Sequence, residues 1–546
     1  MADGWETLPI EFSGGLITNL SPIQQGINMP GSARQLRNFE PSIEGGYKRI
    51  LGYQKYDTSA VPGSGIIRGL AYLNGKVVVA RSNVGNTEGH LFESPGDGTW
   101  DPVTNTAGQV VKLSNGSGKV RFVKYNIGAG DKLMIVDGVK YPIIYDGTPA
   151  NLVELTSAPT GLSGADHVTV YKRLIVVANE NRLFVSATAS DTDFTPAGGA
   201  FEDVFPATIT GLVVFRNTLY VFTTKTISAI TATSFADVNR QPISNDLGCV
   251  EPDTIQEIAG DVVFMGPDGL RLLSGTDKIG DVGLATVTKN IQSEINSFLT
   301  KHNSFSSFLI RGKSQYRILG WRAGDSVSNS QGLLGTQFAQ QGGGEMAWAE
   351  TRGIKAFVTH SEYSGTNELI FFANDDGYVY QLEQGNAFDT DVINASFFSP
   401  YLPINDPTLR KTIYSVHTYL DPEGSFRAAM RLNYDFGGAE VIQPDPIDLT
   451  NILESGSGDY DIGMYGSSLF STHEVDASAA VNGAVIATTA TANVNGATSS
   501  STGVVVDGNN ETITVNQYVS GTGIVGTPYV ATVTDQNNIV LSSVQT

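Results

Sequence analysis

Side chains that could carry out catalysis or bind a metal ion are sparse in this sequence. None of its six histidines stands in a His-x-x-x-His or Glu-x-x-His spacing, which would place two functional groups on one helix face. The single cysteine, Cys249, can form neither an internal disulfide nor a thiolate zinc cluster. No Gly-x-Ser-x-Gly elbow, phosphate loop or dinucleotide fingerprint occurs in a strand-to-helix context. We therefore expect no catalytic residue, cofactor or metal ion, and no enzyme unless the fold brings distant residues together. The histidines are His90, His167, His302, His360, His417 and His473.

Two near-motifs are more specific. Asn374-Asp375-Asp376-Gly377 with Glu383 matches the later oxygen-ligand positions of a calcium loop, but a phenylalanine occupies the first ligand position and both flanks are typical of strands. The segment 94–100, Ser-Pro-Gly-Asp-Gly-Thr-Trp, is similar to a sialidase-type Asp box with altered spacing. Such boxes stabilise turns on propeller blades and carry no catalysis. This segment therefore indicates a fold rather than an activity.

A two-strand unit recurs from about residue 66 to residue 388. Its first strand is apolar and β-branched, as a strand buried on both faces requires, and its second strand alternates more. The first strands lie at 77–80, 133–136, 174–177, 219–222, 262–265 and 369–372. The second strands lie at 90–93, 143–146, 182–185, 226–229, 270–273 and 378–381. Turn dipeptides that favour positive φ recur with them, at Asn74-Gly75, Asp137-Gly138, Asp146-Gly147, Asp268-Gly269 and Asp376-Gly377.

The spacing of these units is typical of propeller blades. Successive first strands begin 41 to 56 residues apart, except for one gap of double length between 262 and 369. That gap can hold another blade, because 307–310 and 315–321 look like paired strands and 346–349 is a further candidate. The pattern predicts an all-β protein with a six- or seven-bladed β-propeller. Two stacked β-sandwiches are the competing interpretation, although sandwiches lack such a regular period.

The rhythm changes on both sides of the repeats. We expect an extended N-terminal arm at 1–60, the propeller at 61–390 and a β-sandwich-like platform at 391–471. A small C-terminal β module is expected at 472–546, where charge is nearly absent and strand signals surround the turn Asp507-Gly508.

Composition and charge limit the function classes. Charged residues make up only 16% of the 546 residues and glycine numbers 61, a profile of strands and turns. A net charge of −21 argues against a static nucleic-acid clamp, which needs clustered Lys and Arg. An acidic wall would instead let DNA slide past without sticking. The alternative is that the acidic surface only keeps the protein soluble. The first residues lack a secretory signal pattern and no apolar run could span a membrane, so we expect synthesis in a cytoplasm and no membrane-spanning segment.

The N-terminal segment carries a family resemblance. It reads Phe-Ser-Gly-Gly-Leu-Ile-Thr-Asn at 12–19, Arg-Asn-Phe-Glu-Pro at 37–41 and Gly-Gly-Tyr-Lys-Arg-Ile-Leu-Gly-Tyr at 45–53. This resembles the N-terminus of tail nozzle proteins of short-tailed bacteriophages, also called tail tubular protein B or stabilisation proteins. The alternative is an ordinary arm punctuated by Gly and Pro turns. The resemblance does not cover the C-terminal module.

The resemblance implies a structural protein of the virion tail, made in the host cytoplasm. It implies a homohexameric ring below a tail adaptor protein, which docks tail fibre or needle proteins and lets duplex DNA pass during ejection. Arg34, Arg37, Lys48 and Arg49 are candidates for contacts with other subunits or the adaptor, because they concentrate positive charge on an acidic chain; ordinary solvated charge is the alternative. Two rival functions are a carbohydrate- or receptor-binding propeller and a propeller glycoside hydrolase, which would need a pair of carboxylates about 5 to 10 Å apart.

Overall fold

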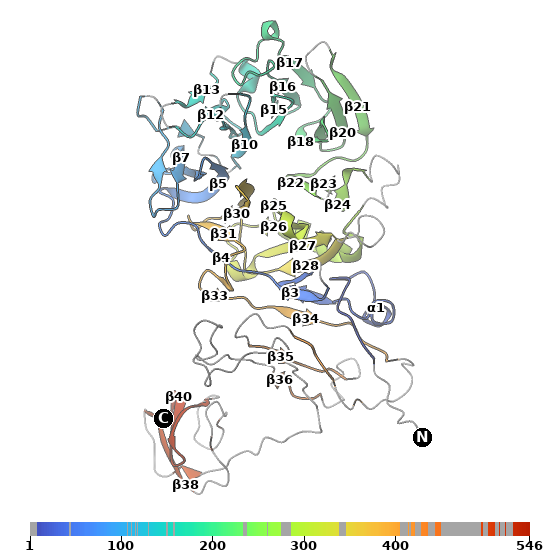
Figure 1. Cartoon of the computed structure of the whole chain (residues 1–546), viewed down its shortest axis with the longest axis vertical. Helices are drawn as coiled ribbons and strands as arrows, with labels where there is room; N and C mark the ends of the chain where they lie inside the picture. Colours follow the sequence, from blue (N-terminus) through green and yellow to red (C-terminus); the bar gives the residue numbers. More distant parts are fainter. Residues whose placement is uncertain are drawn as a thin grey trace. The chain divides into compact units, whose positions relative to one another are not determined.

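The structure is a computed structural model of the chain (Figure 1). It describes residues 8–404 with short gaps, the longest at 275–285 and 338–345. Beyond residue 404 it describes 413, 416–420, 427–434, 443–448, 493–494, 501–507, 513, 519 and 528–545. The chain divides into two compact units, Met1–Asn405 and Asp406–Thr546.

Seven antiparallel sheets form most of the first unit. Blade one contains β5 (Ser64–Leu73), β6 (Lys76–Ser82), β7 (Gly89–Ser94), β8 (Asp101–Pro102) and β9 (Lys112–Leu113). Blade two contains β10 (Arg121–Tyr125), β11 (Lys132–Val136), β12 (Ile143–Tyr145) and β13 (Val153–Glu154). Blade three contains β14 (His167–Tyr171), β15 (Leu174–Asn179), β16 (Arg182–Val185) and β17 (Phe201–Val204). Blade four contains β18 (Ile209–Phe215), β19 (Thr218–Thr223), β20 (Ile227–Thr231) and β21 (Asn239–Ser244).

The remaining three blades follow the same order of strands. Blade five contains β22 (Glu251–Ile258), β23 (Asp261–Gly266) and β24 (Gly269–Leu272). Blade six contains β25 (Ser304–Ile310), β26 (Gln315–Trp321), β27 (Gln331–Gln337) and β28 (Met346–Thr351). Blade seven contains β29 (Val358–Ser364), β30 (Asn367–Ala373) and β31 (Val379–Leu382). Helix α3 (Gln292–Lys301) and the short 3-10 helices η2 (Thr160–Leu162), η3 (Pro196–Gly198), η5 (Lys289–Ile291), η6 (Arg311–Lys313) and η7 (Val327–Asn329) lie between strands.

The first strands of the sheets contact one another in a closed cycle. In order they are β5, β10, β14, β18, β22, β25 and β29, and β29 contacts β5 again. This arrangement confirms the predicted all-β propeller and gives it seven blades. The recurring apolar strand of the sequence is the second strand of each blade, and blade six occupies the gap of double length.

The blades pack face to face through their second and third strands. On β6, Val77, Val78 and Val79 are all fully buried, as their β-branched run predicts. Between blades one and two, Leu91 and Leu133 belong to one apolar cluster, and similar clusters join the other neighbours. Cohesion of the ring therefore comes from apolar contact between sheets, which scales with the area removed from water.

The N-terminal segment adds strands to the last two blades. Its elements are α1 (Pro22–Asn28), β1 (Gln35–Arg37), β2 (Phe39–Pro41), β3 (Tyr47–Arg49) and β4 (Tyr53–Lys55). Strand β4 pairs with β31 and completes blade seven, while β1 pairs with β28 at the edge of blade six. The ring is thus closed by a strand from the far end of the sequence. Strand β2 contacts β28, and Figure 1 shows the N-terminal segment in blue, with α1 and β3 labelled.

The residues after the repeats continue these two sheets. They form β32 (Ala387–Phe388), β33 (Asp391–Val392) and β34 (Ser396–Phe398). Strand β34 pairs with β1, and β32 pairs with β4 and β33. The segment expected as an extended arm at 1–60 therefore shares sheets with the propeller. So do the first residues of the platform expected at 391–471.

The second unit contains short strands and one small sheet. Its strands are β35 (Ala429–Met430), β36 (Ile447–Asp448), β37 (Asn493–Val494), β38 (Ser501–Asp507), β39 (Val530–Asp535) and β40 (Asn538–Gln545). The sheet runs β37-β38-β40-β39, and its small core includes Val504, Val530 and Leu541. Most of the platform expected at 391–471 lies outside the described residues. In the described part of the chain, no helix has the length and apolarity to cross a membrane.

The division into two units predicts that the first one folds alone. A chain truncated after residue 405 keeps every described propeller strand and all strands that close the ring. We expect cooperative thermal unfolding with a Tm within about 3 °C of the full chain, measured by circular dichroism. A truncated chain that is insoluble, or that unfolds much earlier, would show that the second unit belongs to the propeller core.

Candidate functional site: the propeller axis and its closure

The segment similar to an Asp box forms a hydrogen-bonded turn between β7 and β8. The Asp97 carboxylate accepts hydrogen bonds from the backbone N–H and hydroxyl of Thr99, at 3.1 and 2.7 Å. Ser94 donates to Asp57 at 2.7 Å, and the indole of buried Trp100 donates to the carbonyl of Ser59 at 3.0 Å. These contacts bind the turn to the segment that follows β4. They are the structural contacts that the sequence predicts for such a turn.

The segment similar to a calcium loop uses its oxygen atoms within the protein. Asn374 accepts the backbone N–H of Asp376 at 2.7 Å, and Asp376 accepts the hydroxyl of Tyr380 at 2.7 Å. Asp375 forms an ion pair with Lys355 at 2.7 Å. Glu383 lies elsewhere, in the ion cluster described below. The structure does not bring the five residues together around one point.

The four basic residues proposed for contacts with other subunits already have partners within the chain. Arg37 forms an ion pair with Glu350 at 3.2 Å, and Arg49 donates to Asn386 at 2.9 Å. The Arg34 guanidinium lies 4.8 Å from the ring centre of Tyr401. Lys48 is exposed on β3 and also has an interaction within the chain. Their role toward a second molecule stays a prediction.

A buried ion cluster holds the N-terminal segment against blades six and seven. Arg317, on the middle of β26, is fully buried and contacts Glu40 and Glu383, both at 2.9 Å. Lys313 contacts the same two carboxylates at 2.7 and 2.6 Å. Two cations and two carboxylates thus neutralise each other. We call these four residues, Glu40, Lys313, Arg317 and Glu383, the closure cluster.

Other residues of the resembling motif support the same closure. The Asn38 side chain donates to the carbonyl of Asn394 and accepts the backbone N–H of Arg352, both at 2.8 Å. The Tyr47 hydroxyl accepts the Gly15 N–H at 3.1 Å. Gly15 has φ +68°, and an added Cβ would lie 2.7 Å from the carbonyl oxygen of Trp348, so this position requires glycine.

A second charged cluster lies in the interior of the ring of blades. Arg121, at the start of β10 in blade two, forms a bidentate pair with Asp253 on β22 in blade five, at 2.8 and 3.0 Å. Lys119 contacts the same carboxylate at 3.1 Å and donates to the carbonyl of Phe305 in blade six. Blades two and five are not neighbours in a ring of seven. These side chains therefore meet across the interior of the ring.

Burial shifts the pKa values of the groups in this axial cluster. Burial alone would raise the pKa of Asp253, but Arg121 and Lys119 outweigh it and hold that pKa well below its ordinary range. Burial raises the pKa of Glu251 to about 7 and that of Asp166 to about 6, against the nearby cations. Burial lowers the pKa of His167 to about 3, and Arg121 adds to the effect. Two carboxyls therefore titrate near neutral pH.

Strand β10 carries a second cation, Lys124. Lys124, on β10, lies 3.8 Å from Glu362 on β29 and 3.6 Å from Asp131. His360, next to Thr359 on β29, has a buried Nε2 atom without a hydrogen-bond partner among the described residues. Burial lowers the pKa of His360 to about 4, so the ring is neutral at physiological pH. The contact of Lys124 with Glu362 thus joins blade two to blade seven, on the two sides of blade one.

Sequence reasoning did not identify either cluster. Arg317 offered a signal, because it stands inside the mostly apolar strand Gln315–Trp321, and a buried charge needs a partner. The strands of Arg121 and Asp253 carry further charged residues, so these two positions did not stand out. The sequence does not say which partner, because the pairs join different blades.

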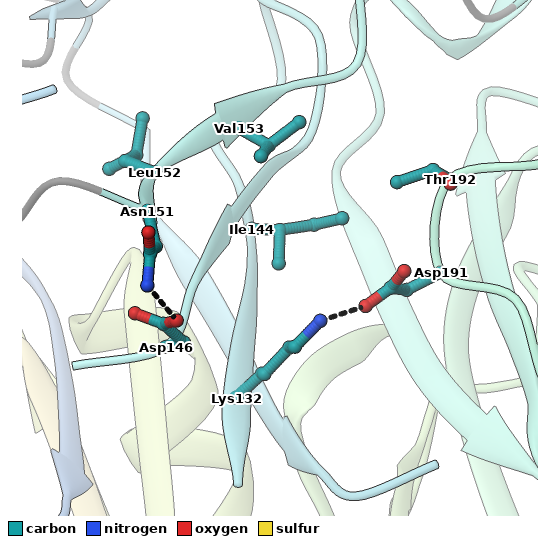
Figure 2. A pocket seen from close by; sticks show the side chains of 8 residues that line it. All are labelled: Lys132, Ile144, Asp146, Asn151, Leu152, Val153, Asp191 and Thr192. Carbon is teal, nitrogen blue, oxygen red and sulfur yellow. Dashed lines mark hydrogen bonds and ion pairs between the residues drawn. The ribbon is translucent and has the colours of Figure 1, made fainter. Parts of the chain in front are cut away.

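A hollow between blades two and three stands apart from these clusters. It has a volume of about 390 Å³ (Figure 2). Lys132 pairs with Asp191 at 2.8 Å on one side, and Asn151 donates to Asp146 at 2.9 Å on the other. Figure 2 shows Ile144 between these two polar pairs. The other lining residues are Leu152, Val153 and Thr192.

Comparison with known proteins finds no family model and no curated sequence that matches the chain. Among solved structures, a streptogramin B lyase covers 61% of this chain and 98% of its own, with 14% identity and a TM-score of 0.36. The extracellular domain of the one-component system BT4673 from B. thetaiotaomicron covers 62% and 40%, with 11% identity and a TM-score of 0.37. The AfRom2 CNH domain covers 61% and 100%, with 11% identity and a TM-score of 0.35. The propeller assignment rests on the strand pairings and not on these similarities.

The closure cluster predicts a stability loss for Glu40→Gln. The buried Arg317 guanidinium would lose one of its two carboxylates, which should lower the free energy of unfolding by about 2 kcal/mol or more. Glu202→Gln is the control, since its pair with Arg182 is exposed and should contribute less than about 1 kcal/mol. Chemical denaturation of both variants measures the difference. Equal stability of the two variants would contradict a structural role for the cluster.

The axial cluster predicts a pH dependence of stability through Glu251. Its folded pKa, about 7, lies above the ordinary value of 4.5, so the folded state holds an extra proton between these values. Stability from this group is fully present below pH 4.5, is lost as pH rises from about 4.5 to about 7, and changes no further above that range. Glu251→Gln should raise Tm at pH 8 by roughly 2 °C and leave it unchanged at pH 5. Glu257→Gln, at an exposed position of the same strand, should shift neither value.

Proposed function

We propose that this protein is a structural subunit of the tail nozzle of a short-tailed bacteriophage. The observation that carries the proposal concerns the residues that resemble that family. Asn38 contacts Asn394 and Arg352, and Glu40 contacts Arg317 of blade six, while Gly15 and Tyr47 contact each other within the N-terminal segment. The resemblance thus falls on residues that build the fold, as expected where a fold is shared.

In this proposal the conduit lies outside the propeller, because charged side chains cross the interior of each ring of blades. DNA would pass through the centre of a ring of subunits instead. A closed ring requires head-to-tail contacts between unlike faces of neighbouring copies. Six copies carry a summed formal charge of 6 × −21 = −126. An inner wall of this sign repels phosphate and gives DNA no point of attachment.

The work of such a subunit is mechanical. Below a tail adaptor, the ring would seal the tail before infection, dock fibre or needle proteins on its outside and guide duplex DNA during ejection. In this proposal the protein resides in the virion tail after synthesis in the host cytoplasm. It performs no catalysis.

Electron cryo-microscopy of the purified full chain and of purified virion tails tests the assembly. We expect ring-shaped particles, either from the chain alone or on the adaptor. Monomers at every concentration, together with absence from purified tails, would contradict the proposal.

Binding of duplex DNA should be negligible at physiological salt, because an acidic surface releases no counterions from the phosphates. Tight, salt-sensitive binding would contradict the conduit.

A further inference from the structure

The hollow between blades two and three has a volume and lining residues that suit a small ligand. Its volume of about 390 Å³ lies within the range of about 300–1,000 Å³ that is usual for ligand sites. Its walls come from the outer strands β12 and β13 of one blade and the loop after β16 of the next. Figure 2 shows polar side chains on two sides and the apolar side chains of Ile144, Leu152 and Val153 between and above them.

The polar atoms of the hollow are mainly hydrogen-bond acceptors. The Lys132 ammonium and the Tyr125 hydroxyl both donate to Oδ2 of Asp191, at 2.8 and 2.9 Å. The second carboxylate oxygen of Asp191 therefore keeps its capacity to accept. Asn151 donates through Nδ2 to Asp146, which leaves its amide oxygen as a further acceptor. A ligand that fits these atoms must supply several donors.

The charge of the lining argues against an anionic ligand. Two carboxylates, Asp146 and Asp191, face one ammonium, Lys132, which already pairs with Asp191. A phosphate or carboxylate would meet a site of net negative charge whose cation is occupied. A neutral molecule with several hydroxyl groups avoids this repulsion, because each hydroxyl both donates and accepts.

The apolar residues complete the match. Leu152 and Val153 adjoin the polar residue Asn151 in sequence, and Ile144 lies between the two polar pairs. A pyranose ring presents hydroxyl groups around its edge and C–H groups on its faces, so it can contact carboxylates and aliphatic side chains together. We propose that this hollow binds one neutral saccharide residue through its hydroxyl groups. The inference is independent of the tail-nozzle proposal, since it rests on the lining of the hollow alone.

Ligand-observed NMR of the full chain tests the site. The probes are glucose, galactose, mannose and N-acetylglucosamine, with choline and acetate as charged probes. We expect saturation transfer to at least one sugar and none to the methyl protons of acetate. Binding of no sugar, or of choline in place of the sugars, would overturn the assignment.

Variants connect the binding to the hollow. Asn151→Ala and Thr192→Ala each remove a polar group from the lining, and each should lower the affinity for the bound sugar by about tenfold. Asn105→Ala is the matched control, because Asn105 also stabilises a turn but belongs to blade one. It should leave the affinity unchanged. Thermal unfolding of each variant verifies the fold, and unchanged affinity in folded Asn151→Ala and Thr192→Ala would overturn the site.

Discussion

The rest of the fold depends on how the ring of seven blades is closed. Each blade buries its faces only against its two neighbours, so an open ring would expose the apolar faces of the first and last blades to water. Strand β4 completes blade seven and so keeps the ring closed. The segment that precedes β4 is held in place by the ion pair between its Glu40 and the buried Arg317. A buried guanidinium is costly unless it is paired, which makes the closing position of this segment specific.

A second buried ion pair, in the interior of the ring, also fixes the position of distant segments. Arg121 and Asp253 come from blades two and five, and their bidentate pair fixes the distance across the ring. Lys119 adds a contact to blade six. Glu251 lies beside this pair with a pKa near neutrality, so solution pH acts on the centre of the propeller. The pairing of β4 with β31 and the ion pair between Arg121 and Asp253 together favour one number of blades.

The sequence allowed prediction of what is local and periodic. The β-branched runs, such as Val77–Val79, and their regular spacing predicted the strands and the propeller, and the double gap predicted blade six. Contacts between distant segments left no such signal. In the sequence, β4 is a short polar stretch, and only its pairing with β31 identifies it as a strand of blade seven. The sequence likewise does not identify Glu40 as the partner of Arg317. The hollow forms between two adjacent blades, so the sequence did not predict it either.

Hydrogen exchange of backbone amides tests the closure most directly. Ring closure by β4 predicts that the amides of β4 and β31 exchange as slowly as those of central strands such as β6 and β15, through global unfolding. Glu40→Gln should accelerate exchange in β4 and β31 more than in the other blades. Fast exchange of β4 in the unmodified protein, with the other blades protected, would show that the ring stays folded without its closing strand and would contradict this account.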